Sequence, residues 1–539
     1  MQDYEEFSEA QLRVLERYVT NTSSNIFVLR NLPEVIKGAL FSRYSRSSLG
    51  LRSLLLKEFI QGEETAFGAI VGHEDESAEN QMLALQKAQN FYDRILDGYG
   101  DDSIGELGGA HVAIENVSML AAKMIEDSRI GGSPLEKSTR YIYFDQKVNG
   151  QYLYYRDPIL MTSAFKEAYL KTCDMLFETY SKLIPPLTEI MERKFPKEQE
   201  KSKAAYSAAV RAKVLDCLRG LLPAGTLTNM GVFGNGRFWE NLINKMECQN
   251  LVELQEIGGQ LFDELHKVIP SFVRRAERHH RHHESYALFV ESMREQIKSV
   301  AEHHRLPKHE TNPGARLIYH DPDGAYKVAA GLLFPFEVGS LEDLQNYCRR
   351  LPDEEIAKIF DAASSTRENR RHKSPRALEH AQFTFEIVAD YGIYRDLHRH
   401  RMLTQERQNL TTDYGYWTPD EILDTPMEKP YREAMEEAYE VHQRIAADLP
   451  EEAQYVVPMA YHVRWYFHVN LRALQWLCEL RSQAAGHIGY RLIAQEMASQ
   501  VSQVLPQFET FFKFVDYEGY DLGRLDQEQR KAEKSKLQQ

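Results

Sequence analysis

The sequence Leu222-Pro223, with Gly234-Asn235-Gly236-Arg237 after it, returns downstream as Val457-Pro458, with Val469-Asn470-Leu471-Arg472 after it. The spacing from Pro223 to Asn235 equals the spacing from Pro458 to Asn470. Agreement in both residue type and spacing indicates an internal repeat, and a repeat has to be recognised before a fold class is assigned.

Two further pairs of segments repeat in the same order. Residues 27–41 resemble residues 317–334, and each segment has the pattern of a short strand, a proline turn and a helix start. Residues 103–114 resemble residues 374–385 in the same way. Because the order is the same in both halves, we interpret the chain as an ancient duplication.

The junction between the copies is expected over residues 275–313, a stretch that includes the histidine-rich run at residues 279–283. His279 and His283 lie one helical turn apart, as metal ligands often do, but Glu284 is the only carboxylate or thiol at ligand spacing. A polar helix or linker is the simpler interpretation, so we predict no metal. The predicted domains are residues 1–285 for the first copy, 286–313 for the linker and 314–539 for the second copy.

Apolar spacing predicts a mixture of long helices and short strands. Helical spacing is found over residues 165–183, 252–268 and 491–514. Strand-like alternation is found over residues 141–144, 152–155 and 383–387. Strands and helices do not alternate regularly, so the expected fold class is α+β, with two tandem copies of one domain built from long helices and a mixed or antiparallel sheet.

The composition favours a folded protein that binds small anions. The 539 residues carry a net charge of −15, and 43% of them are hydrophobic. General nucleic-acid binding needs a basic face, so the acidic balance argues against a nucleic-acid partner. Local arginine clusters in an acidic protein still suit nucleotides and other small anions.

Cysteine usage and the chain ends indicate a cytoplasmic protein. The five cysteines are scattered and form no CxxC pair, which fits reduced thiols rather than a disulfide framework or a zinc site. The acidic start, residues 1–6, is unlike a signal peptide. No apolar run reaches the roughly 18 residues of a membrane helix, so no membrane partner is expected. The charged tail, residues 526–539, is expected to fray.

Two arginine clusters are candidates for anion binding. The first is Glu136-Lys137-Ser138-Thr139-Arg140-Tyr141, in which an extended backbone would turn Glu136, Ser138 and Arg140 the same way. A hydroxyl beside a guanidinium suits a phosphate, because both groups donate to its oxygens. The second cluster is Arg399-His400-Arg401. Either cluster by itself would most simply be surface charge.

Taken together, the clusters resemble the signature of the flavin-dependent thymidylate synthases. That family has one continuous stretch, in which Arg-His-Arg is followed by Asn-Glu and then by Ser-x-Arg-Tyr. Here the second half keeps Arg399-His400-Arg401 but has no Ser-x-Arg-Tyr after it. The first half has Ser128-Arg129-Ile130 where Arg-His-Arg belongs, and keeps Glu136-x-Ser138-x-Arg140-Tyr141.

Two further arginines of the family are divided in the same way. One stands four residues before the repeated proline, where the first half has Arg219 and the second has Gln454. The other stands eleven residues after the repeated asparagine, where the first half has Met246 and the second has Arg481. Each half therefore keeps what the other has lost, a pattern not expected of random decay.

The family resemblance implies a reason for this division. Members of the family resemble homotetramers whose active sites lie between subunits. A fused chain could keep one composite site, with Ser-x-Arg and Arg219 from the first half and Arg-His-Arg and Arg481 from the second. A homodimer of such chains would mimic the tetramer. The implied reaction is a methyl transfer that turns dUMP into dTMP, with FAD, NADPH and 5,10-methylenetetrahydrofolate.

The resemblance also implies roles for individual residues. Expected dUMP contacts are Glu136, Ser138, Thr139, Arg140, Arg219, Asp396 and Arg399. Arg481 is expected to be catalytic, at the uracil ring, where it would favour the ionised base and activate C5. Expected FAD contacts are Arg399, His400, Arg401, Asn235, Arg237 and Asn241, together with either Ser103 and Glu106 or Ser374 and Glu379.

Asp396 departs from the family pattern, which usually has glutamine at this position. A carboxylate beside a phosphate or a uracil carbonyl would repel it. One alternative is therefore an enzyme of the same fold that acts on another pyrimidine nucleotide. A second alternative is a non-catalytic scaffold that binds nucleotide or flavin, but decay of that kind would not leave one composite set of residues intact.

Overall fold

We describe a computed structural model of the chain over residues 7–45, 47–60, 105–198, 202–304 and 311–537. The chain forms two compact units. The first unit comprises Met1–Glu115, Met124–Glu136 and Asn229–Leu306, and the second comprises Asn116–Lys123, Lys137–Thr228 and Pro307–Gln539. The second unit thus combines a long segment of the first sequence half with nearly all of the second half.

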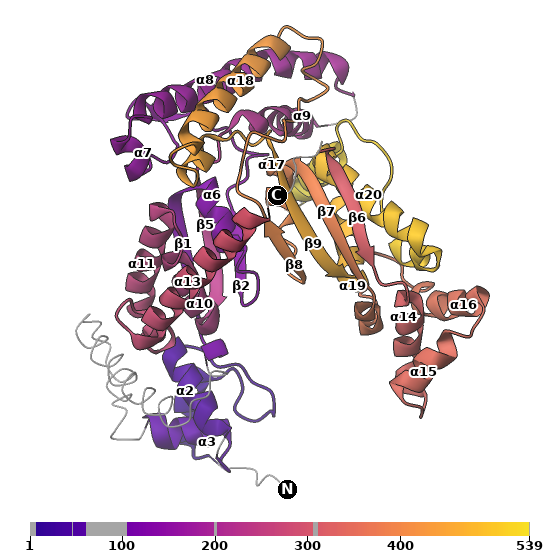
Figure 1. The fold of residues 1–539 in the computed structure, drawn as a ribbon. Coiled ribbons are helices and arrows are strands. Elements are labelled where there is room, and N and C mark those ends of the chain that lie inside the picture. Colours follow the sequence, from indigo (N-terminus) through magenta and orange to yellow (C-terminus); the bar gives the residue numbers. More distant parts are fainter. Residues whose placement is uncertain (1–6, 46, 61–104, 199–201, 305–310, 538–539) are drawn as a thin grey trace. The chain divides into compact units, whose positions relative to one another are not determined.

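The first unit holds most of a three-stranded sheet and the helices around it (Figure 1). The strand order is β1-β5-β2, with β1 at Gly109–Ser118, β5 at Leu227–Asn235 and β2 at Gly132–Glu136. β2 and β5 are antiparallel, and Glu136 pairs with Met230. The helices are α1 (Glu9–Tyr18), α2 (Glu34–Tyr44), α3 (Leu51–Leu54), α10 (Gly236–Glu247), α11 (Val252–His266), α12 (Pro270–Val273) and α13 (Arg281–His303).

The second unit contains a four-stranded antiparallel sheet with the order β6-β7-β9-β8 (Figure 1). Its strands are β6 (Gly314–His320), β7 (Gln382–Asp390), β9 (His462–Asn470) and β8 (Leu403–Arg407). Its helices from the second half are α14 (Gly324–Leu333), α15 (Leu341–Cys348), α16 (Asp353–Ser364), α17 (Tyr391–Leu397), α18 (Glu428–Ala446), α19 (Leu471–Arg481), α20 (Ile488–Val504) and α21 (Leu525–Leu537).

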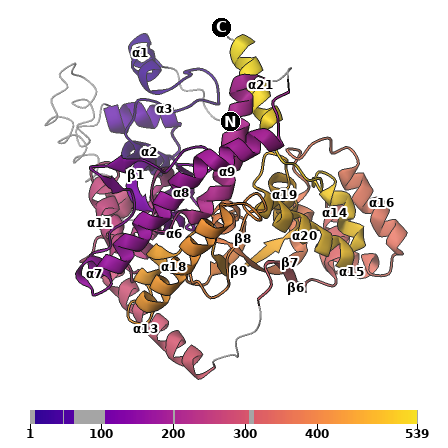
Figure 2. The same ribbon diagram turned by 90° about the horizontal axis from the view of Figure 1, so that it is seen from above.

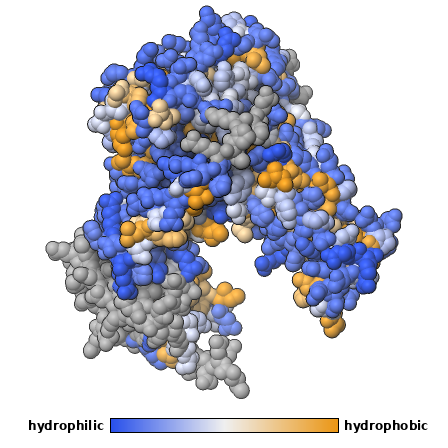
Figure 3. Space-filling view, in the orientation of Figure 1, coloured by the Kyte–Doolittle hydropathy of each residue, from blue (hydrophilic) through white to orange (hydrophobic). Residues whose placement is uncertain are grey.

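The first half contributes the first five residues of α6 (Met119–Glu126) and three complete helices to this second unit. They are α7 (Pro158–Thr162), α8 (Lys166–Lys194) and α9 (Lys203–Leu218), and the short hairpin of β3 (Lys147–Val148) and β4 (Gln151–Tyr152) precedes them. α8 and α18 lie side by side in both views (Figures 1 and 2), and Lys171 of α8 pairs with Glu437 of α18 at 3.7 Å. The second unit's surface is mainly hydrophilic in the view of Figure 3.

The topology repeats as the sequence predicts. The order β1-β5-β2 of the first copy corresponds to β7-β9-β8 of the second. β5 leads into α10 as β9 leads into α19, and the asparagine at each junction caps the helix in the same way. The side chain of Asn235 accepts from the backbone of Phe238, and that of Asn470 accepts from Ala473. The predicted α+β class is confirmed.

The repeated prolines meet in a seam with local two-fold symmetry inside the second unit. Pro223 and Pro458 form an antiparallel bridge. The backbone N–H of Ala224 donates to Val457 at 2.8 Å, and its counterpart Met459 donates to Leu222 at 2.9 Å. A second matched pair follows, from Gly225 to Tyr455 at 2.8 Å and from Ala460 to Gly220 at 2.9 Å. The two halves are therefore joined by equivalent backbone bonds.

The core of the second unit lies on one face of its sheet. Alternate residues of β9 are buried, because successive side chains of a strand point to opposite faces. Phe383 on β7 meets Phe508 of the segment after α20 in an edge-to-face contact, with ring centroids 6.4 Å apart. Phe508 also packs on Phe360 of α16 at 5.5 Å. This aromatic layer holds the helices against the sheet.

The periodicity predictions succeed for the long elements. The helices over residues 165–183 and 252–268 are confirmed as α8 and α11, and the strand at 383–387 is confirmed within β7. The helix over 491–514 is only partly right, because α20 ends at Val504 and Pro506, which has no backbone N–H, starts a separate 3-10 turn.

Three expectations were wrong in their local detail. Residues 141–144 form a turn and an irregular segment, not a strand. Leu29 makes only an isolated bridge to Val19, so no strand stands at the first-copy counterpart of β6. The described part of the tail is helical to Leu537 and not frayed, because α21 packs on α9 (Figure 2) and Gln529 accepts a hydrogen bond from the backbone of Ser202 at 2.9 Å.

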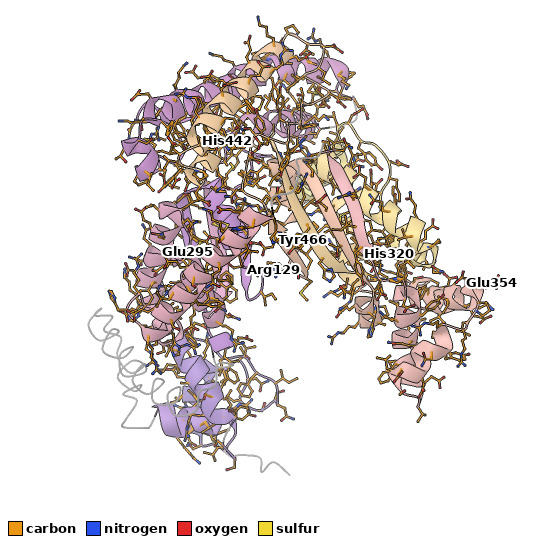
Figure 4. All side chains as sticks on the ribbon, in the orientation of Figure 1. Arg129, Glu295, His320, Glu354, His442 and Tyr466 are labelled. Carbon is orange, nitrogen blue, oxygen red and sulfur yellow. The ribbon has the colours of Figure 1, made fainter. Side chains whose placement is uncertain are left out.

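The aromatic layer yields a stability prediction for β9. Phe467 is fully buried, whereas its neighbour Tyr466 is 38% exposed on the opposite face (Figure 4). Phe467→Ala should lower the free energy of unfolding by about 3–5 kcal/mol through lost burial and the cavity left behind. Tyr466→Ala should cost less than about 1 kcal/mol. Urea denaturation measures both, and similar losses for the two variants would contradict this packing.

Candidate active site

Four arginines, two from each sequence half, approach one carboxylate within the second unit. Asp396 lies in α17, and its side chain is 20% exposed. Burial alone would raise its pKa, but nearby guanidinium charges hold that pKa below its ordinary range. The charges, in decreasing order of effect, are those of Arg219, Arg140, Arg481 and Arg399. The carboxylate therefore marks the point on which both halves converge.

Arg219 makes the closest of these contacts. It follows the last residue of α9, and its Nη1 donates to Asp396 Oδ2 at 3.0 Å. The residue is 4% exposed, and its Nη2 is buried without a hydrogen-bond partner. Sequence reasoning expected Asp396 to repel an anion here. In the structure its charge is instead compensated by Arg219, which keeps one donor unsatisfied.

Arg140 is held by a carboxylate that the sequence analysis did not single out. Its Nε and Nη2 donate to the two oxygens of Asp216 at 2.6 and 2.7 Å, which is the bidentate fork typical of arginine. Its Nη1 donates to the hydroxyl of Tyr490 at 3.0 Å. Burial would raise the pKa of Asp216, but the Arg140 charge lowers it below its ordinary value.

The segment around Arg140 is a turn and not the extended strand that was expected. β2 ends at Glu136, the last residue of its segment in the first unit. The Ser138 hydroxyl accepts from the backbone N–H of Arg140 at 3.2 Å, and Thr139 is buried. Ser138 and Arg140 are thus brought together by a side-chain-stabilised turn, not by strand alternation.

Tyr490 connects the arginine of one half to that of the other. The Arg140 guanidinium carbon lies 5.7 Å from the centroid of its ring, and the Arg481 guanidinium carbon lies 5.5 Å from it. Both distances fall within the range of cation–π attraction. Tyr490 therefore sits where the first-half and second-half parts of the predicted composite site meet.

His400 orients Arg481. The Nε of Arg481 donates to Nε2 of His400 at 2.9 Å, so this ring nitrogen is an acceptor. The pKa of His400 is held well below its ordinary value by burial, and further by the Arg481 charge. The ring is therefore neutral near pH 7, and Arg481, the last residue of α19, has a fixed direction.

The second-half residues expected to contact FAD gather at one end of the second unit's sheet. Asn470 pairs with Gln382, and Leu403, two residues after Arg401, pairs with Val469. Arg472, just beyond Asn470, donates to Glu379 at 2.7 Å and to the backbone oxygen of Ser374 at 2.9 Å. The Ser374 hydroxyl is buried without a partner. Arg399 and Arg401 are exposed at the surface.

The first-half counterparts form a similar arrangement in the first unit. Arg237 pairs with Glu106 at 2.8 Å, as Arg472 pairs with Glu379. Asn241 lines a pocket together with Ser128 and Arg129, and Arg129 is half-buried with a positive φ of 50° (Figure 4). Ser103 lies outside the described residues. Both copies thus keep the same arginine–glutamate pair.

The positions where each half has lost a signature residue are occupied by local contacts. The side-chain oxygen of Gln454, the counterpart of Arg219, accepts from the backbone of Leu410 at 3.1 Å. Met246, the counterpart of Arg481, is fully buried in α10. Thr411, the counterpart of Arg140, accepts from the backbone of Asp413 at 3.1 Å. These side chains stabilise their own surroundings and present no cation.

Sequence reasoning missed Asp216, His487 and Tyr490. Asp216 could have been found, because it precedes Arg219 by three residues near the end of one helix and so shares its face. His487 and Tyr490 belong to the turn and start of α20, and no spacing links them to the arginine motifs. His487 accepts from the backbone of Gly489 through Nδ1, and its Nε2 faces the carbonyl of Asp216 at 3.3 Å.

The histidine-rich run forms no metal cluster within the part of the chain that the structure describes. His283 of α13 is buried, with Nδ1 at 2.7 Å from Asn244 Oδ1 and Nε2 at 3.3 Å from Glu247. Its ring is therefore used in packing α13 against α10. Among the described helices, none combines the length and apolar character needed to cross a membrane.

His487 gives the second unit a pH dependence. Its pKa is lowered to about 3, first by burial and then by the Arg219 charge. The ring stays neutral in the folded chain, whereas an unfolded histidine takes up a proton near pH 6.5. This part of the stability is complete above about pH 6.5 and declines as the pH falls toward the folded pKa.

We expect His487→Asn to lose less stability on acidification than the unchanged chain. Asparagine also caps helices but does not titrate. At about pH 5 the difference should be on the order of 1–2 kcal/mol, measured by urea denaturation at pH 7 and pH 5. If both proteins lose the same free energy of unfolding over this range, His487 is not the group responsible.

Comparison with known proteins gives one family and three informative relatives. A family model described as thymidylate synthase complementing protein matches residues 61–271 and again residues 317–507, which confirms two tandem copies. The chain is 59% identical to a UPF0159 protein of Chlamydia muridarum, over 98% of both chains. It is 33% identical to a UPF0159 protein of Thermoplasma acidophilum, over 93% of this chain and 99% of the relative. It is 26% identical to a flavin-dependent thymidylate synthase of Clostridium tetani, over 35% of this chain and 83% of the relative.

Proposed function

The chain belongs to the thymidylate synthase complementing protein family, and from this premise we propose that it is a flavin-dependent thymidylate synthase with one composite site per chain. The observation that supports the proposal most is the convergence of Arg140 and Arg219 with Arg399 and Arg481 around Asp396. Neither half supplies all four cations, but the second unit contains them together.

The chemistry of these groups suits an anionic nucleotide. The buried Nη2 of Arg219 has no partner, and a buried unsatisfied donor costs about 1–3 kcal/mol. An oxyanion of dUMP would satisfy it. Asp216 and Asp396 balance the arginine charges and hold the guanidinium groups in place. We propose that Glu136, Ser138 and Thr139 complete the phosphate and sugar side.

Arg481 is the proposed catalytic residue. Its Nε donates to His400 and its guanidinium also interacts with the Tyr490 side chain, so the group would face a ligand in a fixed orientation. A guanidinium beside the uracil oxygens would stabilise the ionised base and the charge that develops as C5 reacts. Neutral His400 is important here, because a protonated ring could not accept from Arg481. This arrangement needs no cysteine nucleophile.

The residues at the sheet end fit FAD. The buried, unpartnered hydroxyl of Ser374 is a donor without a protein acceptor, and exposed Arg399 and Arg401 could meet a pyrophosphate. We propose that these residues hold the cofactor, together with their neighbours His400, Glu379, Asn470 and Arg472. The corresponding residues of the first copy are Asn235, Arg237, Asn241 and Glu106. When bound, FAD would supply the hydride for the methyl group, with NADPH as reductant and 5,10-methylenetetrahydrofolate as one-carbon donor.

Asp396 has a defined place in this proposal. Because it pairs with Arg219, it presents a neutralised carboxylate rather than a repelling charge. This removes the charge repulsion that spoke against dUMP. We further propose a homodimer, whose four domain copies would mimic a tetramer; light scattering should then give twice the chain mass of 62.5 kDa.

We expect the purified protein to bind FAD and to release the C5 hydrogen of dUMP when NADPH and 5,10-methylenetetrahydrofolate are added. Flavin absorbance and tritium release from labelled dUMP measure the two steps. A protein that shows no flavin absorbance after FAD has been added and the unbound FAD removed would rule the proposal out. Reaction with another pyrimidine nucleotide but not with dUMP would favour the alternative substrate.

Arg140→Ala and Arg481→Ala should each lower turnover by roughly a hundredfold or more, because each removes a charged donor from the composite site. The matched controls are Thr411→Ala and Met246→Leu, at the corresponding positions of the other copy, and both should keep near-normal activity. Circular dichroism checks that each variant is folded. Equal losses from the arginine variants and the controls would refute a single composite site.

A further inference from the structure

The C-terminal segment lines a pocket on which Arg140 also opens. The wall from the first half includes Lys213, Asp216 and Cys217. The opposite wall is the run Tyr520–Arg524, which lies beyond the family match that ends at residue 507. The pocket therefore adjoins the composite site, but one of its walls is supplied from outside the two family domains.

The segment is fixed in this position by close contacts on both sides. Gly523 approaches the backbone so closely that an added Cβ would clash with the carbonyl oxygen of Ala484. The guanidinium of Arg524 lies 4.0 Å from the centroid of the ring of Tyr141, the residue that follows Arg140 in the chain. α21, which begins at Leu525, then packs along α9 (Figure 2). Arg524 is thus placed by backbone and ring contacts together.

The charges around this pocket are incompletely balanced at Arg524. Asp216 is engaged by Arg140, and Glu421 is engaged by Lys213. The only ion pair that Arg524 makes in the described chain is with Glu528, through Nη2 at 3.4 Å, and its Nε is buried without a partner. The remaining carboxylate of the pocket wall, Asp521, is exposed.

Two guanidinium groups in one pocket repel each other, and the carboxylates beside them, Asp216 and Glu528, offset this repulsion only in part. The side chain of Arg524 is only 14% exposed, so water screens this repulsion incompletely. Burial lowers the pKa of Arg524, and the positive charge of Arg140 lowers it further. An anionic ligand would relieve the repulsion and satisfy the unpaired Nε.

We propose that Arg524 is a further substrate-positioning residue, which donates to the phosphate monoester of the nucleotide and closes the pocket around it with Tyr520–Gly523. The inference rests on the proposed function for the choice of ligand. It adds a cation from the C-terminal extension to the four that the family domains supply. Its chemistry is phosphate recognition by a guanidinium fork, which is independent of the base.

The test compares dUMP with deoxyuridine, which lacks the phosphate, by isothermal titration calorimetry on the full chain. Arg524→Ala should weaken dUMP binding by roughly 10–100-fold, as expected for a lost charge-assisted hydrogen bond, and leave deoxyuridine binding unchanged. Arg524→Lys, which keeps the charge, should recover part of the affinity, and Arg524→Gln should not. In turnover assays the KM for dUMP should rise while kcat changes little.

Arg530→Ala is the matched control, because Arg530 is an exposed arginine of α21, the helix that begins directly after Arg524. It should bind dUMP like the unchanged chain. Normal dUMP affinity in Arg524→Ala would overturn the proposal, as would equal losses for dUMP and deoxyuridine, which indicate a structural role. If Arg524→Ala does not fold, the dUMP affinities of Arg524→Lys and Arg524→Gln are compared instead. Equal dUMP affinities for these two variants would overturn the proposal.

The outcomes also separate this inference from the proposed function. A chain that binds dUMP or another pyrimidine nucleoside monophosphate in an Arg524-dependent way but forms no dTMP supports the inference and refutes the function. A chain that forms dTMP while Arg524→Ala binds dUMP normally supports the function and refutes the inference.

Discussion

The composite site depends on the backbone seam between the two proline segments. Ala224 donates to Val457 and Met459 donates to Leu222, and the symmetry of these bonds fixes one copy against the other. Arg219 stands just before the first proline, so the seam sets where its guanidinium enters the second half. The backbone of Gly392, in the helix that contains Asp396, donates in turn to Met459. A covalent duplication alone would not place these groups; the hydrogen-bonded seam does.

The arginines are kept in place by carboxylates whose own burial is costly. Burial of a charge is tolerated only when it is paired and hydrogen-bonded, and the bidentate Arg140–Asp216 pair satisfies this condition. Such a site is preorganised, because the guanidinium groups need not be desolvated or turned when a nucleotide arrives. Within this preorganised site, the unsatisfied nitrogen of Arg219 leaves one strong donor for an incoming anion. Neutral His400 likewise fixes the orientation of Arg481 before a ligand binds, by accepting a hydrogen bond from its Nε.

The sequence allows the repeat, the α+β class and the division of the arginines to be predicted, because each depends on residue type at regular spacing. Tyr490 and Arg524 could not be predicted, because their contacts with Arg140 and Tyr141 join segments that are hundreds of residues apart. The extended geometry expected for Ser138 was wrong because a side-chain hydrogen bond to the backbone competes with the strand. The ion pair of Asp396 could not be predicted for a related reason: its partner, Arg219, lies 177 residues away in the sequence.

The seam also bears on how such a chain can change over evolutionary time. All four of its hydrogen bonds join main-chain groups, and these exist whatever side chains are attached. Drift in either copy can therefore replace many side chains along the seam without separating the halves. The exceptions are Gly220 and Gly225, where neighbouring atoms leave no room for a Cβ. A proline would also be excluded where it removes one of the four N–H donors, at Ala224, Gly225, Met459 or Ala460. Because the seam depends little on side-chain identity, each copy can diverge separately. The presence of Arg219 in one copy only, and of Arg481 in the other copy only, is divergence of this kind.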